Sequence, residues 1–521
     1  MAELDQLVMK EQEISSSMLM ERVGQEIARR FTLHIRKDEL PNGGRIENRR
    51  VLVLVGPGNN GGDGLVVARH LIQTRRYPVS VVLVGAKKLS DDCRLNLVRL
   101  LDLNQPVFGF GGNVEDPHIP LMKDEAFERL FFRSGIIIDA LLGTGQSGPL
   151  RGPLFELVST VQRLRTESPS QKKLFLSIDI PTGVSGDTGQ VFSPSFDADL
   201  TFTVQHQKFG MTQGAARKRC GKVLPIEAGI RSPHWRPNFF ATSRESLKDL
   251  PPRSATSHKG TYGHVLVLGG SKKMPGAASL SSIGASSTGA GKVTQVVFDS
   301  GIAIPPEIMR IPLTGNFLDP NNITDILSRV ERGEFQALVV GPGLGTAEAT
   351  LEAFEKLLSV LTRINCPTVI DADGLNLLSC LGLTKRLAKA RNFIITPHPG
   401  EAARLLGLQT ALVVEDSSSA VKQLHLQYGA VSLLKGAGTV IWDGKTGAVN
   451  TTGTGFLATG GTGDVLAGMI GGFMAQGLSP FKAGCLGAFL HGKAAEELGN
   501  HPFPASVLGD VARNLIAVSD L

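Results

Sequence analysis

The sequence predicts two consecutive α/β domains, each built on a mostly parallel sheet with crossover helices. Its 521 residues are too many for one ordinary hydrophobic core. Short runs rich in Val, Ile and Leu alternate with amphipathic segments along most of the chain, which is the rhythm of β-α-β units. This rhythm is interrupted once, between residues 230 and 259, where prolines and polar residues replace it.

The first domain begins with a predicted helix over residues 14–31, which the serines at 15–17 would cap. Six apolar runs with the length of buried strands follow this helix. They are VLVLVG from residue 51, VSVVLVG from 79, GIIIDALLG from 135, LFLSIDIP from 174, DLTFTV from 199 and KVLPIEAG from 222.

The interruption contains Pro233, Pro237, Pro251 and Pro252 and shows no periodicity, which indicates a linker or an edge segment. We place the first domain at residues 1–230, the linker at 231–244 and the second domain at 245–521. No repeat of fixed period is present, so we expect two different domains.

A second series of apolar runs follows the interruption: HVLVLGG from residue 264, KVTQVVF from 292, ALVVGPGLG from 337, PTVIDADG from 367, FIITPHPGE from 393 and AVSLLKGAG from 430. Asp443 and Gly444 predict a hairpin turn. Residues 455–478 are long and nearly uncharged, but Asp464 and many glycines argue against a membrane span. We expect a glycine loop followed by a buried helix over residues 465–475.

The composition favours a globular enzyme that handles anionic small molecules. The net charge of +6 is spread without a basic run, so we expect no nucleic-acid partner. The five cysteines (Cys93, Cys220, Cys366, Cys380 and Cys485) show neither CxxC nor Cys/His ligand spacing, which argues against disulfides and zinc and for the reducing cytoplasm. The N-terminal segment lacks the apolar core of a secretory signal, so we expect no cleavage there.

Three motifs of the first domain carry polar groups at strand ends. The glycine loop from Gly56 to Gly64 follows a strand and opens a helix, where backbone N–H groups can receive a pyrophosphate. Asp139 and Asp179 end two further strands, and the carboxyl ends of parallel strands converge on a ligand crevice. Each motif alone could be a turn or a helix cap, but their recurrence favours a site.

These motifs, NNGGDG, DALLGTG and SIDIPTGV, with LMERVG before them, resemble the NAD(P)HX epimerase family over roughly residues 1–230. The resemblance implies a Rossmann-like, three-layer domain that interconverts the R and S forms of the hydrated dinucleotides. It implies that Asp179 is catalytic and that Asn60, Asp139 and Thr182 lie near a potassium ion. The implied substrate-binding residues, besides Asp179, are Asn59, Asn60, Gly61, Gly62, Asp63, Gly143, Thr144, Gly145, Gln146, Ser147, Gly148 and Pro149.

The second domain has an acid after a glycine turn, in GGTGDVLAG at residues 460–468. Backbone N–H groups in such a turn can neutralise a transferring phosphoryl group, while Asp464 accepts a proton from the attacking hydroxyl. Alone, Asp464 would more readily be a helix cap. HPGE at residues 398–401, KGAGT at 435–439, DADGLN at 371–376 and GPGLG at 341–345 also follow strands, so together they favour a phosphoryl-transfer cleft.

This motif set resembles the ADP/ATP-dependent NAD(P)HX dehydratase family, of ribokinase-like fold, over about residues 245–521. The resemblance implies that ADP or ATP phosphorylates the hydroxyl of the S hydrate and that phosphate then leaves. Asp464 would be the base and Glu401 would organise Mg²⁺. The hydrate would contact Ala277, Gly343, Gly345, His398 and Asp464. The nucleotide would contact Lys435, Gly436, Ala437, Gly438, Thr439 and Gly463.

The main alternative is a ribokinase-like small-molecule kinase, such as a relative of hydroxyethylthiazole kinase, fused to a Rossmann-like module that only binds or dimerises. The fusion itself argues against it, because an epimerase can supply one stereoisomer to a stereospecific dehydratase. The implied partners are NADHX or NADPHX and an adenine nucleotide, with no membrane partner, and we expect a homo-oligomer. The sequence does not distinguish ADP from ATP, although the fused arrangement resembles microbial enzymes for which ADP is expected.

Overall fold

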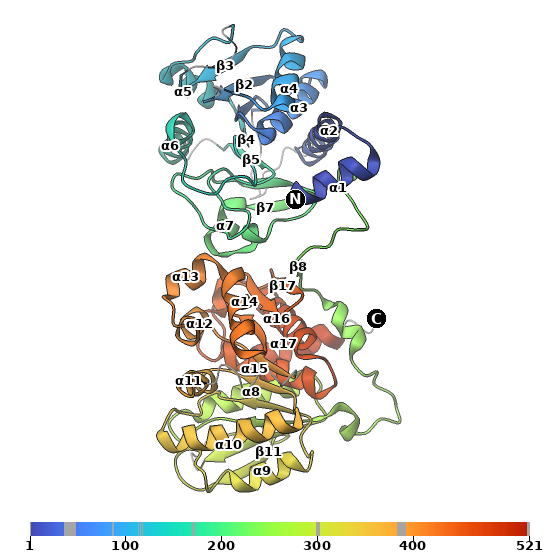
Figure 1. Cartoon of the computed structure of the whole chain (residues 1–521), viewed down its shortest axis with the longest axis vertical. Coiled ribbons are helices and arrows are strands. Elements are labelled where there is room, and N and C mark those ends of the chain that lie inside the picture. The colour runs from blue at the N-terminus through green and yellow to red at the C-terminus, as the bar shows by residue number, and fades with distance from the viewer. Residues whose placement is uncertain are drawn as a thin grey trace. The chain divides into compact units, whose positions relative to one another are not determined.

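The computed structural model describes residues 2–35, 48–85, 88–112, 114, 116, 118–168, 172–298, 303–382 and 392–517. The chain divides into two compact units, Met1–Pro237 and Asn238–Leu521, and each is described by itself (Figure 1). Both units have helices around a mainly parallel sheet, so the α/β fold class predicted from the sequence is confirmed.

The first unit contains a seven-stranded sheet in the order β3-β2-β1-β4-β5-β6-β7, and all of its neighbouring strands are parallel. The strands are β1 (Val51–Val55), β2 (Val79–Val84), β3 (Val107–Phe110), β4 (Ile136–Ala140), β5 (Leu174–Ile178), β6 (Leu200–Val204) and β7 (Lys222–Ile226). The chain runs outward from β1 to β3 and then returns to β4 beside β1. Such a reversal leaves a crevice at the carboxyl ends of β1 and β4, as in Rossmann-like folds.

Helices cover both faces of this sheet. They are α1 (Ala2–Gln12), α2 (Ser16–Ile35), α3 (Asn59–Gln73), α4 (Asp91–Leu101), α5 (Asp124–Arg133), α6 (Gly152–Glu167) and α7 (Gly214–Cys220), with a 3₁₀ turn η1 (Phe209–Thr212). Helices α2, α3 and α4 share one core with the sheet, and α5 and α6 share the core on its other face. Figure 1 shows these two groups on opposite sides, which gives the three layers.

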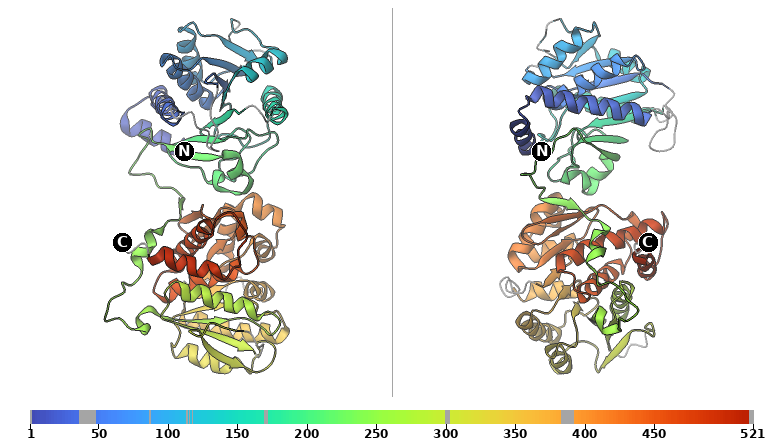
Figure 2. Two further views of the ribbon diagram at one scale, coloured as in Figure 1. Left: turned by 180° about the vertical axis from the view of Figure 1, so that it is seen from behind. Right: turned by 90° about the vertical axis from the view of Figure 1, so that its right-hand side faces the viewer.

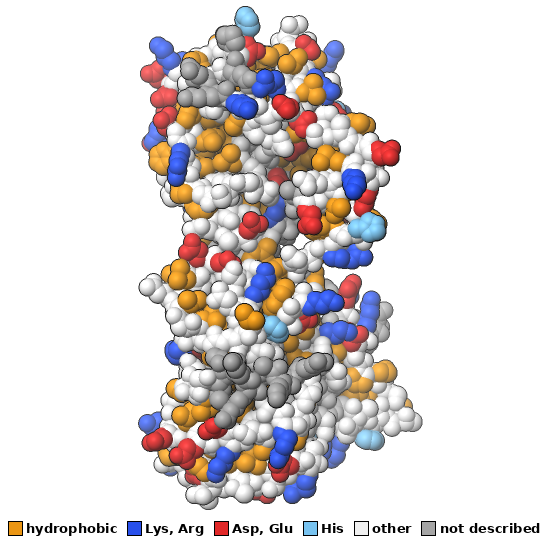
Figure 3. All heavy atoms as spheres, in the orientation of Figure 1, with side chains coloured by type: hydrophobic (Ala, Val, Ile, Leu, Met, Phe, Trp, Pro, Cys, Tyr) orange, Lys and Arg blue, Asp and Glu red, His pale blue; other side chains and the backbone are white. Residues whose placement is uncertain are grey.

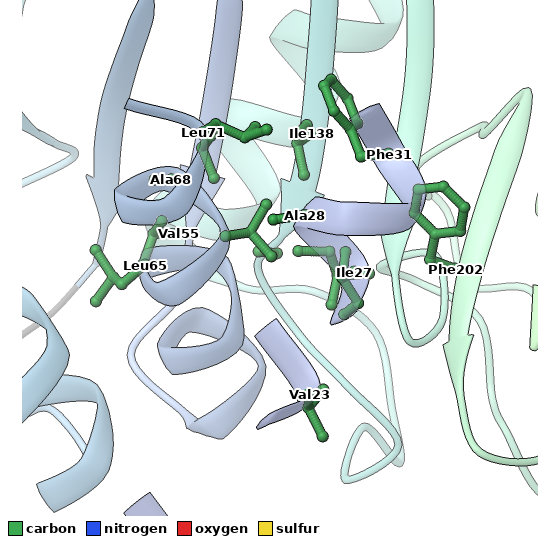
Figure 4. Close-up of a cluster of buried hydrophobic side chains, with 14 of the residues drawn as sticks. Val23, Ile27, Ala28, Phe31, Val55, Leu65, Ala68, Leu71, Ile138 and Phe202 are labelled. Atoms are coloured by element: carbon green, nitrogen blue, oxygen red, sulfur yellow. The ribbon is translucent and has the colours of Figure 1, made fainter. Parts of the chain in front are cut away.

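The core between α2, α3 and the sheet explains why these segments are helical. Ile27 and Phe31 of α2 are fully buried, and they lie near Leu65 and Leu71 of α3 (Figure 4). Ile27 and Phe31 are four residues apart and Ala68 and Leu71 are three apart, so each pair lies on one face of its helix. Figure 2 shows the full length of α2, in blue, in its right-hand view.

Several elements of the first unit differ from the predictions, and β3 was not among the predicted strands. The helix predicted over residues 14–31 is α2, which continues to Ile35, and α1 precedes it without having been predicted. Among the described side chains of α1, only those of Leu4 and Val8 are buried. Most of the other residues of the helix are charged or polar, so its apolar stripe is short.

The second unit contains a ten-stranded sheet in the order β11-β10-β9-β12-β13-β14-β15-β16-β17-β8. Its strands are β8 (Phe239–Ala241), β9 (His264–Leu268), β10 (Lys292–Phe298), β11 (Met309–Leu313), β12 (Ala337–Val340), β13 (Thr368–Ile370), β14 (Phe393–Ile395), β15 (Val431–Leu434), β16 (Thr439–Trp442) and β17 (Gly447–Asn450). Strands β16 and β17 form the antiparallel hairpin predicted around Asp443.

Part of the segment predicted to be a linker or an edge segment forms an edge strand. Within residues 231–244, Phe239–Ala241 form β8, which pairs in parallel with β17 at the edge of the second unit's sheet. Three residues are too few for a strand pattern to be recognised in the sequence. The strand is instead stabilised by its pairing with β17, about 200 residues further along the chain, which the local sequence does not reveal.

The helices of the second unit are α8 (Pro275–Ser287), α9 (Thr324–Glu331), α10 (Glu348–Ile364), α11 (Asp373–Cys380), α12 (Pro399–Leu406), α13 (Thr410–Glu415), α14 (Ser417–Tyr428), α15 (Thr462–Ala475), α16 (Pro480–Glu497) and α17 (Val507–Ala517). Short 3₁₀ turns lie at η2 (Arg244–Asp249), η3 (Lys259–Tyr262) and η5 (Gly455–Leu457).

Helices α8 and α15 pack closely, because small residues face each other. A Cβ added at Gly468 would lie 1.9 Å from the carbonyl oxygen of Ser281, and one at Gly284 would lie 2.2 Å from that of Val465. Residues 465–475 of α15 are all buried, as predicted. None of the helices in the described residues is long and apolar enough to cross a membrane.

Candidate functional site

The first unit has a cavity of about 700 Å³ at the carboxyl ends of its central strands. Strand β4 ends in Asp139 and Ala140, and α3 begins at Asn59 directly after the turn that follows β1. This turn is tight, since a Cβ on Gly61 would lie 1.9 Å from the carbonyl oxygen of Gly56. The cavity is lined by Asp5, Met9, Ser16, Leu19, Met20, Val23, Gly58, Asn59, Asn60, Asp63, Asp92, Leu141, Leu142, Gly143, Thr144, Gly145, Gln146, Asp179, Val204, Lys208 and Ile230.

Some of the predicted substrate-binding residues line the cavity, and the others lie in the segments around it. Asn59, Asn60, Asp63, Gly143, Thr144, Gly145, Gln146 and Asp179 line the cavity. Gly61 and Gly62 are buried in the first turn of α3. Ser147, Gly148 and Pro149 are not among the lining residues, although the carbonyl of Gly148 accepts a hydrogen bond from Gln146 Nε2 at 3.0 Å.

Asp139 is fully buried and anchors the neighbouring loops. Its carboxylate accepts hydrogen bonds from Thr182 Oγ1 at 2.7 Å, Thr182 N at 2.8 Å, Ser177 Oγ at 3.0 Å and Leu141 N at 3.1 Å. Burial raises the pKa of Asp139 to about 6, and these hydrogen bonds oppose the increase.

Asn60 contacts the loop that follows Asp139, and one of its atoms is an unsatisfied acceptor. Its Nδ2 donates to the carbonyl of Leu142 at 2.9 Å, which turns Oδ1 away from that carbonyl. Asn60 Oδ1 is buried without a hydrogen-bond partner in the described residues. An orphaned acceptor, a carboxylate and the hydroxyl of Thr182 form an oxygen donor set, which is the type that hard cations prefer. The residues present therefore fit a potassium ion.

Asp179 has a left-handed backbone, with φ of +66°, directly after β5. Its Oδ1 accepts hydrogen bonds from Val204 N at 3.1 Å and from the ammonium group of Lys208. Lys208 was not predicted as a site residue. The signal that could have found it is its position four residues after the end of β6, at the same sheet edge as Asp139 and Asp179.

Asp63 and Asp5 add two further carboxyl groups to the cavity. Burial raises the pKa of Asp63 well above its usual range, and the charge of Asp179 raises it further. Burial also raises the pKa of Asp5, which belongs to α1. The role of α1 in closing one side of the cavity was not predicted.

In the second unit, Asp464 lies in the first turn of α15, after the left-handed Gly461. Ser281 Oγ of α8 donates to the backbone carbonyl of Asp464 at 2.9 Å. His491 of α16 is buried, and its Nε2 donates to the carbonyl of Thr462 at 2.9 Å. Both contacts hold the backbone of the glycine turn, so the Asp464 carboxylate is not needed to cap the helix, and no side-chain cap is present there.

The Asp464 carboxyl is surrounded by other charges. Burial raises its pKa to about 7, the charge of Asp371 raises it further, and Lys435 opposes the increase. Such a value is suitable for a general base near neutral pH.

Lys435 follows β15 and lies against Gly463, at which an added Cβ would be 3.4 Å from Lys435 Nζ. Its Nζ is 2.7 Å from Asp371 Oδ1 and 4.0 Å from Glu401 Oε2. Burial lowers the pKa of Lys435, but Asp371 and Glu401 outweigh this effect and the net pKa is raised. The structure therefore places the ammonium group of Lys435 among carboxylates, while Gly436 and Ala437 of the same loop are exposed.

His398 and Glu401 form a capping box at the start of α12. His398 Nδ1 accepts hydrogen bonds from Gly400 N at 3.0 Å and Glu401 N at 3.4 Å, and Glu401 Oε2 accepts one from His398 N at 2.8 Å. The His398 side chain is 54% exposed, and its Nε2 lies 3.6 Å from Glu401 Oε1. Glu401 Oε1 has no hydrogen bond to a described residue, which leaves one carboxylate oxygen that fits Mg²⁺.

Three of the residues expected to contact the hydrate, Ala277, Gly343 and Gly345, lie around the start of α8. Gly343 has φ of +63°, and a Cβ added to it would lie 3.0 Å from that of Ala277 and 2.5 Å from the carbonyl oxygen of Met274. Gly345 N donates to Asp373 Oδ2 at 2.8 Å. The glycine loop after β12 is therefore held between α8 and α11.

Two family models match the two halves of the chain. One, described as YjeF-related protein N-terminus, matches residues 16–210, and the other, described as NAD(P)H-hydrate dehydratase, matches residues 265–516. A bifunctional NAD(P)H-hydrate repair enzyme from Moorella thermoacetica is 34% identical and covers 95% of this chain and 91% of its own length. The chain belongs to the bifunctional NAD(P)H-hydrate repair enzyme family.

Two further proteins are similar to this repair enzyme. The Escherichia coli protein of the same name is 34% identical and covers 75% of this chain and 70% of its own length. A solved ADP/ATP-dependent NAD(P)H-hydrate dehydratase from Bacillus subtilis, co-crystallised with ATP/Mg²⁺, is 30% identical and covers 53% of this chain and 97% of its own, with a TM-score of 0.45. The family expected from the motifs of both halves is confirmed.

Proposed function

We propose that the first unit epimerises the R and S forms of hydrated NADH and NADPH, and that the second unit dehydrates the S form with ADP or ATP. The observation that carries the proposal is that one chain, matching bifunctional repair enzymes over 95% of its length, contains both the Asp179 cavity and the Asp464 turn. The alternative, a kinase fused to a non-catalytic module, is disfavoured because both halves match the same relatives.

The epimerase chemistry follows from the structure of the hydrate. Protonating the enamine of a dihydronicotinamide makes the carbon beside the ring nitrogen electrophilic, so water adds there. Configuration at this carbon inverts if the ring opens: the hydroxyl loses its proton, a C=O bond forms, and the C–N bonding pair passes to nitrogen, which takes up a proton. Closure on the other face of the carbonyl reverses each transfer. One carboxylate next to both atoms, Asp179, can carry this proton in each direction.

Other first-unit residues would bind the substrate. The N-terminus of α3, with Asn59, Asn60 and Asp63, offers N–H groups and polar side chains to a dinucleotide. Gly143, Thr144, Gly145 and Gln146, from the loop after β4, would also contact it. Asn60, Asp139 and Thr182 would hold a potassium ion, which when bound supplies fixed positive charge beside the anionic substrate.

In the second unit, Asp464 would accept the proton of the hydrate hydroxyl as the oxygen bonds to the terminal phosphorus of the nucleotide. The bridging P–O bond then breaks and releases AMP from ADP, or ADP from ATP. Phosphate departs with the C–O bonding pair, the adjacent ring carbon loses a proton, and the dihydronicotinamide is restored. The sequence of steps needs no redox partner, and it replaces hydroxide, a poor leaving group, with phosphate.

The phosphates would lie over the backbone N–H groups of the Gly463 turn and the KGAGT loop. Glu401 would hold Mg²⁺, whose charge offsets that of the phosphates. Ala277, Gly343, Gly345 and His398 would contact the hydrate. The position of Lys435 among Asp371 and Glu401 supports a role in fixing these carboxylates as well as in nucleotide binding.

The test uses the purified full-length protein with a mixture of hydrate epimers, Mg²⁺ and either ADP or ATP, and follows the return of dihydronicotinamide absorbance. We expect complete conversion of both epimers, with AMP released from ADP. Consumption of only the S fraction, corrected for spontaneous epimerisation, would remove the epimerase assignment. Accumulation of a stable phosphorylated product without dihydronicotinamide would instead favour the kinase alternative.

A further inference from the structure

Lys208 is a buried cation in the wall of the epimerase cavity, and it was not part of any predicted motif. The residue is 8% exposed. Its Nζ donates to the carboxylate of Asp179, to Thr203 Oγ1 at 2.9 Å and to the carbonyl oxygen of Val204 at 3.2 Å. These three bonds use all three N–H donors of the ammonium group. Lys208 is therefore held in one orientation by its surroundings.

The two carboxylate oxygens of Asp179, the partner of Lys208, differ in their hydrogen bonds. Asp179 Oδ1 accepts from both Lys208 Nζ and Val204 N, whereas Oδ2 has no hydrogen bond within the described part of the chain. The left-handed backbone of Asp179, with φ of +66°, and the 2.7 Å bond from its N–H to the carbonyl of Phe202 fix the base of the side chain. Oδ2 is left as the oxygen with free lone pairs in a residue that lines the cavity.

Asp179 shares the cavity with several other carboxyl groups and one cation. The cavity wall contains Asp5 of α1, Asp63 of α3 and Asp92 of α4, and Lys208 is the one Lys or Arg among its described lining residues. Asp5 and Asp63 each interact electrostatically with both Asp179 and Lys208. Lys208 is therefore the cation among the described lining residues that offsets the repulsion between Asp179 and these carboxyl groups.

We infer that Lys208 is a positioning residue of the epimerase, which occupies Oδ1 of Asp179 and fixes the orientation of the carboxylate so that Oδ2 alone exchanges the proton with the hydrate. The inference rests on the proposed epimerase function. Lys208 does not itself exchange a proton with the substrate, because its three donors are already engaged. The proton taken from the hydroxyl by Oδ2 passes to the ring nitrogen as the C–N bond opens, and it returns by the same oxygen on closure.

The experiment compares the full-length protein with Lys208→Met, Lys208→Arg and a control, Lys218→Met, at an exposed lysine of α7. Epimerisation is measured as kcat and KM over a range of pH, and dehydration of purified S hydrate is measured in the same samples. We expect Lys208→Met to lower the epimerisation kcat by about 10²-fold at neutral pH, since a correctly positioned base contributes about 10²- to 10⁴-fold.

The loss should appear in kcat more than in KM, because the substrate-binding residues remain in place. Lys208→Arg should recover part of the loss, and Lys218→Met should behave as the parent. Thermal melting and circular dichroism that match the parent show that the first unit of a variant is folded. An unchanged kcat in Lys208→Met would overturn the inference, as would a loss confined to KM or one that Lys208→Arg does not relieve in a folded protein. Absence of epimerisation in the parent protein would instead refute the proposed function.

Discussion

The ammonium group of Lys435 lies 2.7 Å from Oδ1 of Asp371, a carboxylate that is almost completely buried. The residues are 64 positions apart and follow β13 and β15, which are separated by β14 in the sheet. This pair places a fixed positive charge next to the turn that carries Asp464. The strength of Asp464 as a base therefore depends on a balance between burial, the charge of Asp371 and the charge of Lys435.

Replacing Asp464 with Asn should abolish dehydration while nucleotide binding persists. The amide removes the proton acceptor but leaves the glycine turn, which Ser281 and His491 hold through the backbone. The loss should be about 10²- to 10⁴-fold in kcat at saturating nucleotide. Turnover assays and nucleotide titration test this. Normal turnover would show that Asp464 is not the base.

The dehydration rate should depend on pH through Asp464. Its pKa is raised to about 7, chiefly by burial, and the base acts only when deprotonated. The value of kcat/KM should therefore fall as pH decreases through 7 and approach a tenfold loss per unit below it. Lys435→Met should move this acid limb of the pH profile to higher pH, because the positive charge of Lys435 opposes the increase in the pKa of Asp464. A flat profile between pH 6 and pH 8 would contradict both statements.

Replacing Asp179 with Asn should slow epimerisation and leave dehydration of the S epimer intact, since the two groups belong to different compact units. We expect about a 10²-fold loss or more. The rates of both reactions, measured on purified epimers, separate the effects. Equal loss of both activities in a folded variant would refute this division of labour.

Removal of potassium should lower the epimerisation rate. The buried Oδ1 of Asn60 has no hydrogen-bond partner in the described residues, and an unsatisfied buried acceptor costs about 1–3 kcal/mol. Rates are compared in buffers containing K⁺ or tetramethylammonium at equal ionic strength. Asn60→Leu should remove the response to K⁺. An epimerisation rate that is indifferent to K⁺ would speak against the cation site.

Replacing Gly468 with Ala should destabilise the second unit by about 1–3 kcal/mol, the usual cost of overpacking. The new methyl group would lie 1.9 Å from the carbonyl oxygen of Ser281, so α8 and α15 must separate. The matched control is Gly509→Ala in α17, whose Cβ would meet only side chains, the nearest being Ile283 at 3.1 Å. Thermal melts and dehydration assays should show a loss for Gly468→Ala and none for the control.

The sequence predicted the large elements because their signals are local. Runs such as residues 51–55 and 136–138 are buried on both faces of a parallel sheet, so they are continuously apolar and easily recognised. Asp139 and Asp179 could be assigned to one site because each follows such a run. Rules of strand polarity were sufficient to bring them together.

The missed features depend on contacts between distant parts of the chain. Lys208 has no local signal that distinguishes it from a solvated lysine, and its burial comes from Asp179 and the end of β6. Helix α1 has too few apolar residues to show a clear period. Lys435 was predicted to contact nucleotide, but its pairing with Asp371 arises from two loops that the sheet brings together.

Strand β8 determines where the chain can be cut. Phe239–Ala241 lie in the segment that the sequence predicts as a linker or an edge segment, and they pair with the otherwise unpaired edge of β17. A truncated second half that starts at residue 245 would leave a row of unpaired N–H and C=O groups, and such edges promote aggregation. A fragment that starts at Asn238 would retain the cover. The shorter version could therefore be insoluble even though every residue of the Asp464 site is present.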